Sequence, residues 1–371
     1  MEKKKRLLAL DVLRGMTIAG MILVNNPGSW GHVYAPLRHA EWNGLTPTDL
    51  VFPFFLFMMG VSMYISLKKF NFRLNKELLT KVLRRTVLIF FIGMGIHALS
   101  NILWRWEGWD GLIPSLLDVR IMGVLQRLAL SYCFGSLIVT TFRHRTLPYW
   151  IGGLLAGYAV ILWIGNGFVY GHENILSKID RAIIGISNMY NDNGIEPEGI
   201  LGTIPSIAHV LIGFCVGKLC IEVSDMQEKL NRLFVWGTQL AIIGWLLSYA
   251  CPLNKKVWSP SFVLLTCGLA CMSLALLIRA IDMKKTFHHT LPFEVYGVNS
   301  LFCYVLSQVL SILMGYSFGT STSIHQLVYK DVLCSVFGEG EFASLLYALW
   351  MVAIVWLVSL YLYRKKIYIK F

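Results

Sequence analysis

Long apolar runs alternate with short polar segments along all 371 residues of the chain. Each run is about twenty residues long, the length that a helix needs to cross a hydrocarbon core of about 30 Å. The pattern predicts ten membrane-spanning helices, at 7–25, 49–67, 84–103, 120–141, 148–165, 201–220, 233–250, 257–279, 293–314 and 341–363. We therefore expect an all-α, polytopic membrane helix bundle that forms one transmembrane domain over residues 1–371.

Composition and charge support this class. The chain is 56% hydrophobic and only 15% charged, whereas a soluble domain carries about 25% charged residues. Its net charge of +12 would suggest a nucleic-acid partner in a soluble protein. With a cytoplasmic N-terminus, however, 23 of the 33 Lys and Arg residues fall in inner segments and eight in outer ones. This positive-inside pattern predicts that both termini are cytoplasmic, that the protein binds no nucleic acid, and that His39 lies at the opposite face.

Cysteine and histidine spacing gives little sign of a metal. Six of the eight cysteines fall within predicted spans, where a thiol usually serves as a small apolar filler. Cys251 and Cys334 fall in outer loops, and their spacing leaves open whether they pair. The adjacent His288 and His289 fit a solvated inner loop better than a metal site. We expect no bound metal.

Polar residues inside the spans are costly and usually mark pairing or function. Asp11 and Arg14 in LDVLRG are three residues apart, so they share a helix face. They can form a structural ion pair, or Arg14 can meet a phosphate of an anionic cofactor. Gln126 and Arg127 in RIMGVLQRL lie too deep to snorkel easily. Arg127 therefore needs either a buried partner or an anionic ligand, and both interpretations stay open.

A second polar group falls in the ninth span. Asn299, Ser300 and Tyr304 in GVNSLFCY are expected on one face at helical spacing. They can link helices through hydrogen bonds worth about 1 kcal/mol each, or line a ligand channel.

The first outer loop reads RHAEWNGLTPTDLVFPFF over residues 38–55. His39 supplies an imidazole, the side chain most often used as an acid or base near neutral pH. Asp49 stands at the start of the second helix, where it can cap the helix together with Thr46 or Thr48. A catalytic role for this pair competes with the simpler interpretation of an inert loop histidine and a helix cap.

Aromatic residues gather in the outer loops. They fit an interfacial belt, and they also fit a carbohydrate site, because an aromatic face stacks on the apolar face of a sugar ring. Their density on one side of the membrane favours the carbohydrate interpretation. The tryptophans concerned are Trp30, Trp42, Trp104, Trp106 and Trp109.

Several blocks together resemble one known family. They are LDVLRG, LVNN, RHAEWNGLTPTDLVFPFF, RIMGVLQRL, KIDR, EPEGILGTIPS, NKKVWSPS and PFEVYGVNS, in this order between about residues 8 and 310. The series resembles the transmembrane heparan-α-glucosaminide N-acetyltransferase family, and the chain looks like a shorter, bacterial relative without that family's luminal N-terminal domain. The match thins toward residue 310 and beyond, and Ser307 and Gln308 stand where the family has a His and a Glu. Any role of that pair is in doubt here.

The resemblance implies transfer of acetyl from acetyl-CoA to the amine of a glucosamine-type sugar. It places the active-site histidine at His39, with Asn25 close to it and Asp49 in its family position. His39 would then act as general base or as acetyl-accepting nucleophile, Asn25 would stabilise the oxyanion, and Asp49 would hold the imidazole tautomer. The sequence leaves open whether transfer uses an acetyl-enzyme or a ternary complex.

Charge and position suggest which residues would bind the substrates of such a reaction. The acetyl-CoA co-substrate is anionic and needs cations. Trp42 and Asn43 are expected to contact the sugar, and Glu198 either binds its ammonium group or is a solvated loop carboxylate. The enzyme is expected in the bacterial inner membrane, with the His39 loop periplasmic, and a homodimer is compatible with the family. The residues expected to bind acetyl-CoA are Arg14, Gln126, Arg127, Asn299, Ser300 and Tyr304.

Two other classes of protein fit the pattern. A transporter of sugars or acylated sugars also explains a buried arginine, outer aromatics and interrupted helices, and it predicts substrate flux without thioester consumption. A membrane scaffold would use the polar residues only for packing, which does not explain the polar density of residues 38–49.

Overall fold

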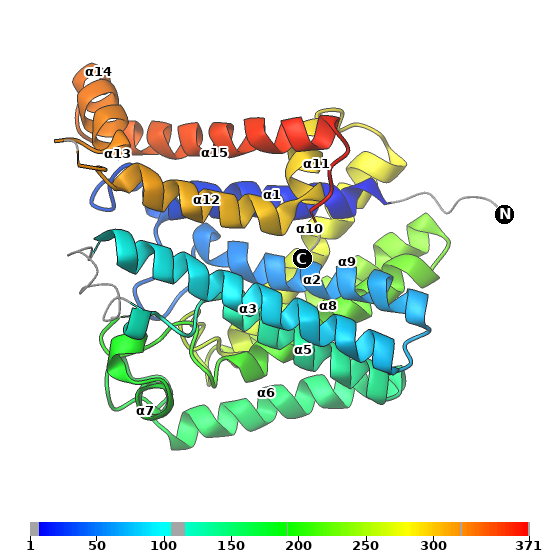
Figure 1. The fold of residues 1–371 in the computed structure, drawn as a ribbon. Coiled ribbons are helices and arrows are strands. Elements are labelled where there is room, and N and C mark those ends of the chain that lie inside the picture. The colour runs from blue at the N-terminus through cyan, green and yellow to red at the C-terminus, as the bar shows by residue number, and fades with distance from the viewer. Residues whose placement is uncertain (1–6, 105–115, 191, 320, 370–371) are drawn as a thin grey trace. The chain divides into compact units, whose positions relative to one another are not determined.

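A computed structural model describes residues 7–104, 116–190, 192–319 and 321–369. In this part of the chain the regular structure is helical (Figure 1), apart from one isolated antiparallel bridge between Asp192 and Ile195. The all-α class expected from the sequence is confirmed.

Nine helices in the described part of the chain are long and apolar enough to cross a membrane. A tenth span results if α11 (Leu291–Val298) and α12 (Ser300–Gly315) are taken together, although they are bent by 87°. This agrees with the ten predicted spans, except that the ninth is broken at Asn299 instead of forming one helix. The side-chain amide of Asn299 stabilises this break, because its Nδ2 donates to Ile367 O at 3.0 Å and its Oδ1 accepts from Ile369 N at 2.9 Å.

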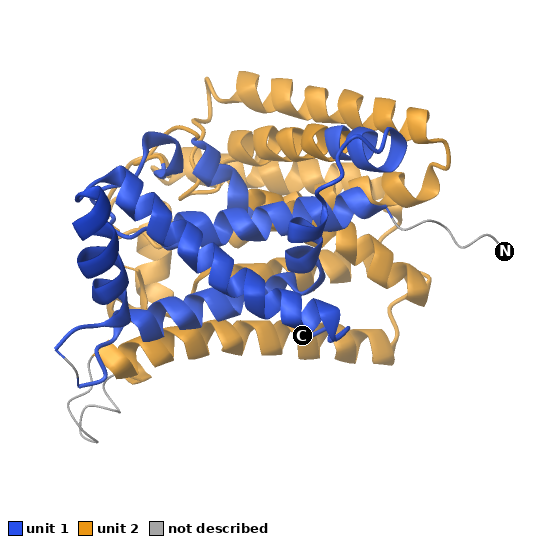
Figure 2. Cartoon of the chain, turned by 90° about the horizontal axis from the view of Figure 1, so that it is seen from above, with its two compact units in different colours: residues 1–39, 46–52, 276–371 blue, residues 40–45, 53–275 orange. Residues whose placement is uncertain are grey.

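The chain divides into two compact units (Figure 2), which comprise residues 1–39, 46–52 and 276–371, and residues 40–45 and 53–275. The single domain expected over 1–371 stays a prediction, as does the cytoplasmic orientation of both termini. All eight cysteines are free thiols, and the six expected within spans lie in helices.

The first unit is built on α1 (Leu8–Asn25), whose backbone packs closely against that of α11. A Cβ atom on Gly297 would lie 2.1 Å from Asp11 O, so only glycine fits there, as at small-residue crossings of membrane helices. Asp282 stabilises the start of α1 by accepting from Leu8 N at 3.0 Å and Ala9 N at 3.1 Å. The unit's other helices are η1 (Ala35–Leu37), η2 (Pro47–Leu50), the π-helix η6 (Ile278–Met283), α12, α13 (Ile324–Gln326), the π-helix η7 (Leu327–Cys334), α14 (Ser335–Phe337) and α15 (Glu341–Arg364).

The second unit surrounds α8 (Thr203–Glu222), the candidate span with the largest buried share, 78%. This helix packs closely on α2 (Val51–Leu67), because a Cβ on Gly60 would lie 2.2 Å from Val210 O. Its other helices are η3 (Lys68–Phe70), α3 (Lys76–Trp104), α5 (Val124–Thr141), η4 (His144–Thr146), α6 (Leu147–Ile164), α7 (Ile175–Ile183), η5 (Ile186–Asn188), α9 (Met226–Leu247) and most of α10 (Pro260–Leu277).

Candidate active site

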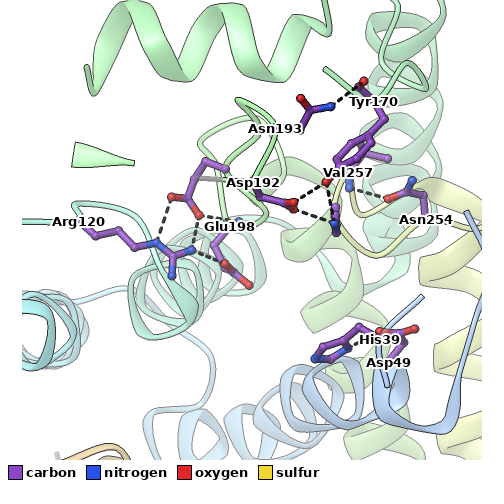
Figure 3. Close-up of polar contacts among 11 residues, drawn as sticks. His39, Asp49, Arg120, Tyr170, Asp192, Asn193, Glu198, Asn254 and Val257 are labelled. Atoms are coloured by element: carbon purple, nitrogen blue, oxygen red, sulfur yellow. Dashed lines mark hydrogen bonds and ion pairs between the residues drawn. The ribbon is translucent and has the colours of Figure 1, made fainter. Parts of the chain in front are cut away.

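His39 and Asp49 form a direct side-chain pair in the first unit (Figure 3). His39 Nδ1 lies 2.6 Å from Asp49 Oδ1; the imidazole is 39% exposed and the carboxyl is buried. The sequence explains this geometry, since Thr46 and Asp49 form a capping box at the start of η2. Asp49 Oδ2 accepts from Thr46 N at 3.1 Å and from Thr46 Oγ1 at 2.9 Å. Asp49 therefore both caps the helix and holds His39.

This pairing sets the chemical character of the imidazole. A carboxylate accepts a hydrogen bond from Nδ1–H, which leaves Nε2 as the basic nitrogen. The ring is part exposed while the carboxyl is buried, so a reactant can approach the imidazole. The pair can therefore work as a general base or a nucleophile, as in a hydrolase triad.

Ser344 and neighbouring residues of the first unit hold the loop that carries His39. Ser344 Oγ accepts from Ser29 N at 3.0 Å, and Ser344 O accepts from Gly28 N at 3.2 Å. The Arg38 guanidinium lies 3.5 Å from Glu341 Oε1. The start of α15 thus clamps the loop between α1 and His39.

Asn25 is the last residue of α1 and is half-buried. Its neighbour Asn26 is buried and donates from Nδ2 to Ile22 O at 2.7 Å. The expected action of Asn25 on an oxyanion beside His39 stays a prediction.

Glu198 belongs to a buried ion-pair cluster in the second unit (Figure 3). Arg120 Nη2 donates to Glu198 Oε2 at 2.6 Å, and Arg120 also binds Glu196 through Nε at 3.0 Å and through Nη2. Burial would raise the pKa of Glu198, but Arg120, Arg127 and Lys255 outweigh it and lower that pKa. Burial raises the pKa of Glu196 despite Arg120. Glu198 is thus held ionised.

Arg127 lies in the first turn of α5, fully buried, with its guanidinium 5.2 Å from the ring centre of Trp258. Its Nη2 donates to Gly199 O at 3.3 Å, while Nε and Nη1 have no hydrogen-bond partner among the described residues. A Cβ on Gly202 would lie 2.2 Å from Arg127 Nη2. Arg127 therefore packs against the segment 196–202, which carries Glu198. Gln126, beside it, is also fully buried.

Asp180 also contacts the segment 196–202. It is fully buried, and its Oδ1 accepts from Ile200 N at 2.9 Å. A Cβ on Gly199 would lie 1.9 Å from Asp180 Oδ2. Burial raises the pKa of Asp180 to about 7.

Trp42 and Asn43 anchor their loop to the second unit. Trp42 Nε1 donates to Phe168 O at 2.8 Å and its ring lies 4.7 Å from that of Tyr170. Asn43 Oδ1 accepts from Asn254 Nδ2 at 3.1 Å. Both polar groups are therefore used within the protein, and the expected sugar contact by Trp42 and Asn43 stays a prediction. Trp106 and Trp109 lie outside the described residues.

The other residues expected to bind acetyl-CoA lie in the first unit, and their described contacts do not join them into one cluster. Arg14 pairs with Asp11 at 3.1 Å, as one of the two interpretations predicted. Asn299 is bonded to the C-terminal backbone, Ser300 begins α12 and Tyr304 is buried. Their role with acetyl-CoA stays a prediction. Among the described residues, no three His, Cys, Asp or Glu side chains are grouped as a metal site requires.

Sequence reasoning did not single out Arg120, Glu196 or Asp180. Arg120 was counted only among the outer charges, although its guanidinium binds both Glu196 and Glu198. The KIDR and EPEG blocks contain the other two residues and were the available signal. Spacing alone does not show that these blocks pack together.

Comparisons with known proteins identify the family. Residues 6–192 match the model described as a domain of unknown function, DUF5009. The mouse heparan-alpha-glucosaminide N-acetyltransferase is 30% identical over 363 residues, covering 82% of this chain and 54% of the relative. The human protein of that name is 28% identical over 425 residues, covering 98% of this chain and 60% of the relative. The chain spans little more than half the length of these curated relatives. It belongs to the DUF5009 family, and its resemblance to the heparan-α-glucosaminide N-acetyltransferases is confirmed.

Proposed function

We propose that this protein is a transmembrane acetyltransferase that moves acetyl from cytoplasmic acetyl-CoA to the amine of a glucosamine-type sugar at the periplasmic face of a bacterial inner membrane. The observation that carries the proposal is the His39–Asp49 pair, with Nδ1 2.6 Å from the carboxylate and a capping box behind it. The acetyltransferase relatives supply the reaction class.

His39 would act through Nε2. As a general base it takes the proton that the sugar amine loses when the amine attacks the thioester carbonyl, and CoA then leaves as the thiol. As a nucleophile it attacks that carbonyl itself, forms an acetyl-imidazole and releases CoA, after which the amine takes the acetyl group. In both routes Asp49 stabilises the charged or substituted ring through Nδ1–H, and Asn25 would donate to the oxyanion.

Glu198 would receive the acceptor, because an ionised, part-buried carboxylate is a good partner for an ammonium group. Arg120 and Arg127 keep it ionised. Arg127 packs against the segment that carries Glu198. We therefore propose that Arg127 contacts the acetyl group or the sugar rather than the phosphates of CoA. Arg14, Gln126, Asn299, Ser300 and Tyr304 are the further residues we propose for acetyl-CoA, and Trp42 and Asn43 for the sugar.

One observation favours a second candidate, a sugar transporter. The break of 87° between α11 and α12 is the kind of discontinuous helix that transporters use at their binding sites. A transporter would move sugar into proteoliposomes without consuming acetyl-CoA.

The experiment is acetyl transfer from radiolabelled acetyl-CoA to glucosamine by the purified protein in detergent. We expect labelled product from the wild type and none above background from His39→Ala. His288→Ala, which changes an exposed histidine of another loop, is the matched control and should keep full activity. Full activity in His39→Ala would refute the catalytic assignment. Sugar uptake by proteoliposomes without thioester consumption would replace the enzyme by the transporter.

A further inference from the structure

A groove of about 740 Å³ runs along α6 in the second unit (helices labelled in Figure 1). Its walls come from α6, α8, α9 and α10 and are mostly apolar. This volume lies within the range of ligand sites, about 300–1,000 Å³. The groove continues along most of α6, from Pro148 to Trp163.

The groove opens toward the surroundings of the bundle. The apolar stretches of α6 and α9 are only 28% and 22% buried, whereas that of α8 is 78% buried. Trp163 and Ile243, both lining residues, are each 53% exposed. In a membrane-spanning bundle such surfaces meet lipid, so the groove is accessible to an acyl chain.

Gly152 shows that the groove is open at its α6 wall. It is a lining residue, and a Cβ atom built on it would meet nothing within 4 Å. The neighbouring Gly153 also has open space around it but does not line the groove. Substituting Gly152 or Gly153 therefore distinguishes the effect of filling the groove from the effect of adding a side chain to the helix.

One end of the groove carries cations. Arg145 precedes the lining residue Pro148 by three positions, Lys218 follows Cys215 by three, and Arg232 precedes Trp236 by four. At this spacing Lys218 and Arg232 extend the groove-lining faces of α8 and α9 by one turn, whereas Arg145 lies in η4, directly before α6.

The charges at the two ends differ. Lys218 and Arg232 are paired with Glu222 and Glu228. Arg143 and Arg145 are exposed and precede the lining residue Pro148 by five and three positions. Near the other end, four residues before Pro260, Lys256 lies 2.7 Å from Asp192. A basic pocket between membrane helices at the cytoplasmic side is suited to an anionic lipid head group.

We infer that this groove is a binding site for one anionic phospholipid, with an acyl chain along α6 and the phosphate at Arg143 and Arg145. The positive-inside pattern assigns that end to the cytoplasmic leaflet. The inference does not depend on the proposed acetyltransferase activity.

Native mass spectrometry of the full-length protein, stripped of lipid in detergent and then given phosphatidylglycerol or phosphatidylcholine, tests this site. The wild type should retain phosphatidylglycerol at least about tenfold better than phosphatidylcholine. Gly152→Leu, which favours the helix but fills the groove, should reduce phosphatidylglycerol retention by about tenfold, while Gly153→Leu should leave it unchanged. The double change Arg143→Gln and Arg145→Gln should remove the preference between the two lipids.

Equal retention of the two lipids by the wild type would overturn the inference, as would equal retention by Gly152→Leu and Gly153→Leu. Loss of a dimer in Gly152→Leu with unchanged lipid retention would show that the groove is a face between copies instead. Ala156→Leu, at a second lining position of α6, repeats the test if Gly152→Leu does not fold.

Discussion

Asp49 divides its two carboxylate oxygens between the His39 side chain and the start of η2. Oδ1 lies 2.6 Å from His39 Nδ1, and Oδ2 accepts two hydrogen bonds from Thr46. The capping box of η2 thus fixes Asp49, and Asp49 in turn fixes the orientation of the His39 ring, the proposed base.

Asp49→Asn should lower kcat by about 100-fold or more with little change in KM, because an amide no longer selects the Nδ1–H tautomer. The measurement is steady-state acetyl transfer, with circular dichroism to verify folding. Asp331→Asn, at an exposed position, should be neutral. An Asp49→Asn protein with wild-type kcat would mean that Asp49 only caps η2.

Much of this site follows from local sequence, and the rest depends on long-range packing. The Thr46–Asp49 capping box is a four-residue signal, so the pairing of Asp49 with the helix start was predictable. The spans follow from hydropathy alone. In contrast, Arg120 meets Glu196 and Glu198 across 76 and 78 residues, and no periodicity encodes such a contact. The break at Asn299 also depends on the C-terminal backbone at residues 367 and 369.

Ser344→Ala should reduce kcat several-fold and lower the unfolding free energy by about 1 kcal/mol, since Ser29 N would lose its acceptor. If Ser344 positions the His39 loop, Ser344→Ala should lower kcat without changing KM for acetyl-CoA, and Ser344→Thr should restore kcat. Ser335→Ala is the control, because Ser335 is exposed and its hydroxyl donates to Asp331 O and Val332 O of its own segment. Loss of stability without any change in kcat would leave Ser344 a purely structural residue.

Asp180 should make stability depend on pH. Its pKa is raised to about 7 by burial, so between about pH 4 and 7 the folded state binds a proton that the unfolded state releases. The stability therefore falls as pH rises through this window, by up to about 1.4 kcal/mol per pH unit from this group, and levels off above pH 7. Asp180→Asn keeps the acceptor for Ile200 N and should flatten the profile. Thermal unfolding of both proteins from pH 4 to 8 checks this, and parallel profiles would contradict it.

Glu198→Gln should raise KM for glucosamine by about tenfold or more while leaving KM for acetyl-CoA unchanged, because the amide loses the charge that attracts the ammonium group. Glu173→Gln is the control: Glu173 belongs to the same connection between α6 and α8, is 77% exposed and pairs with Lys178. A collapse of the Arg120 cluster would also raise KM, so a second acceptor is needed. Hydroxylamine is a small nucleophile that is largely neutral at the assay pH and does not need Glu198, and Glu198→Gln should acetylate it at the wild-type rate. If both acceptors lose activity equally, Glu198 supports the fold of the site and does not bind the sugar.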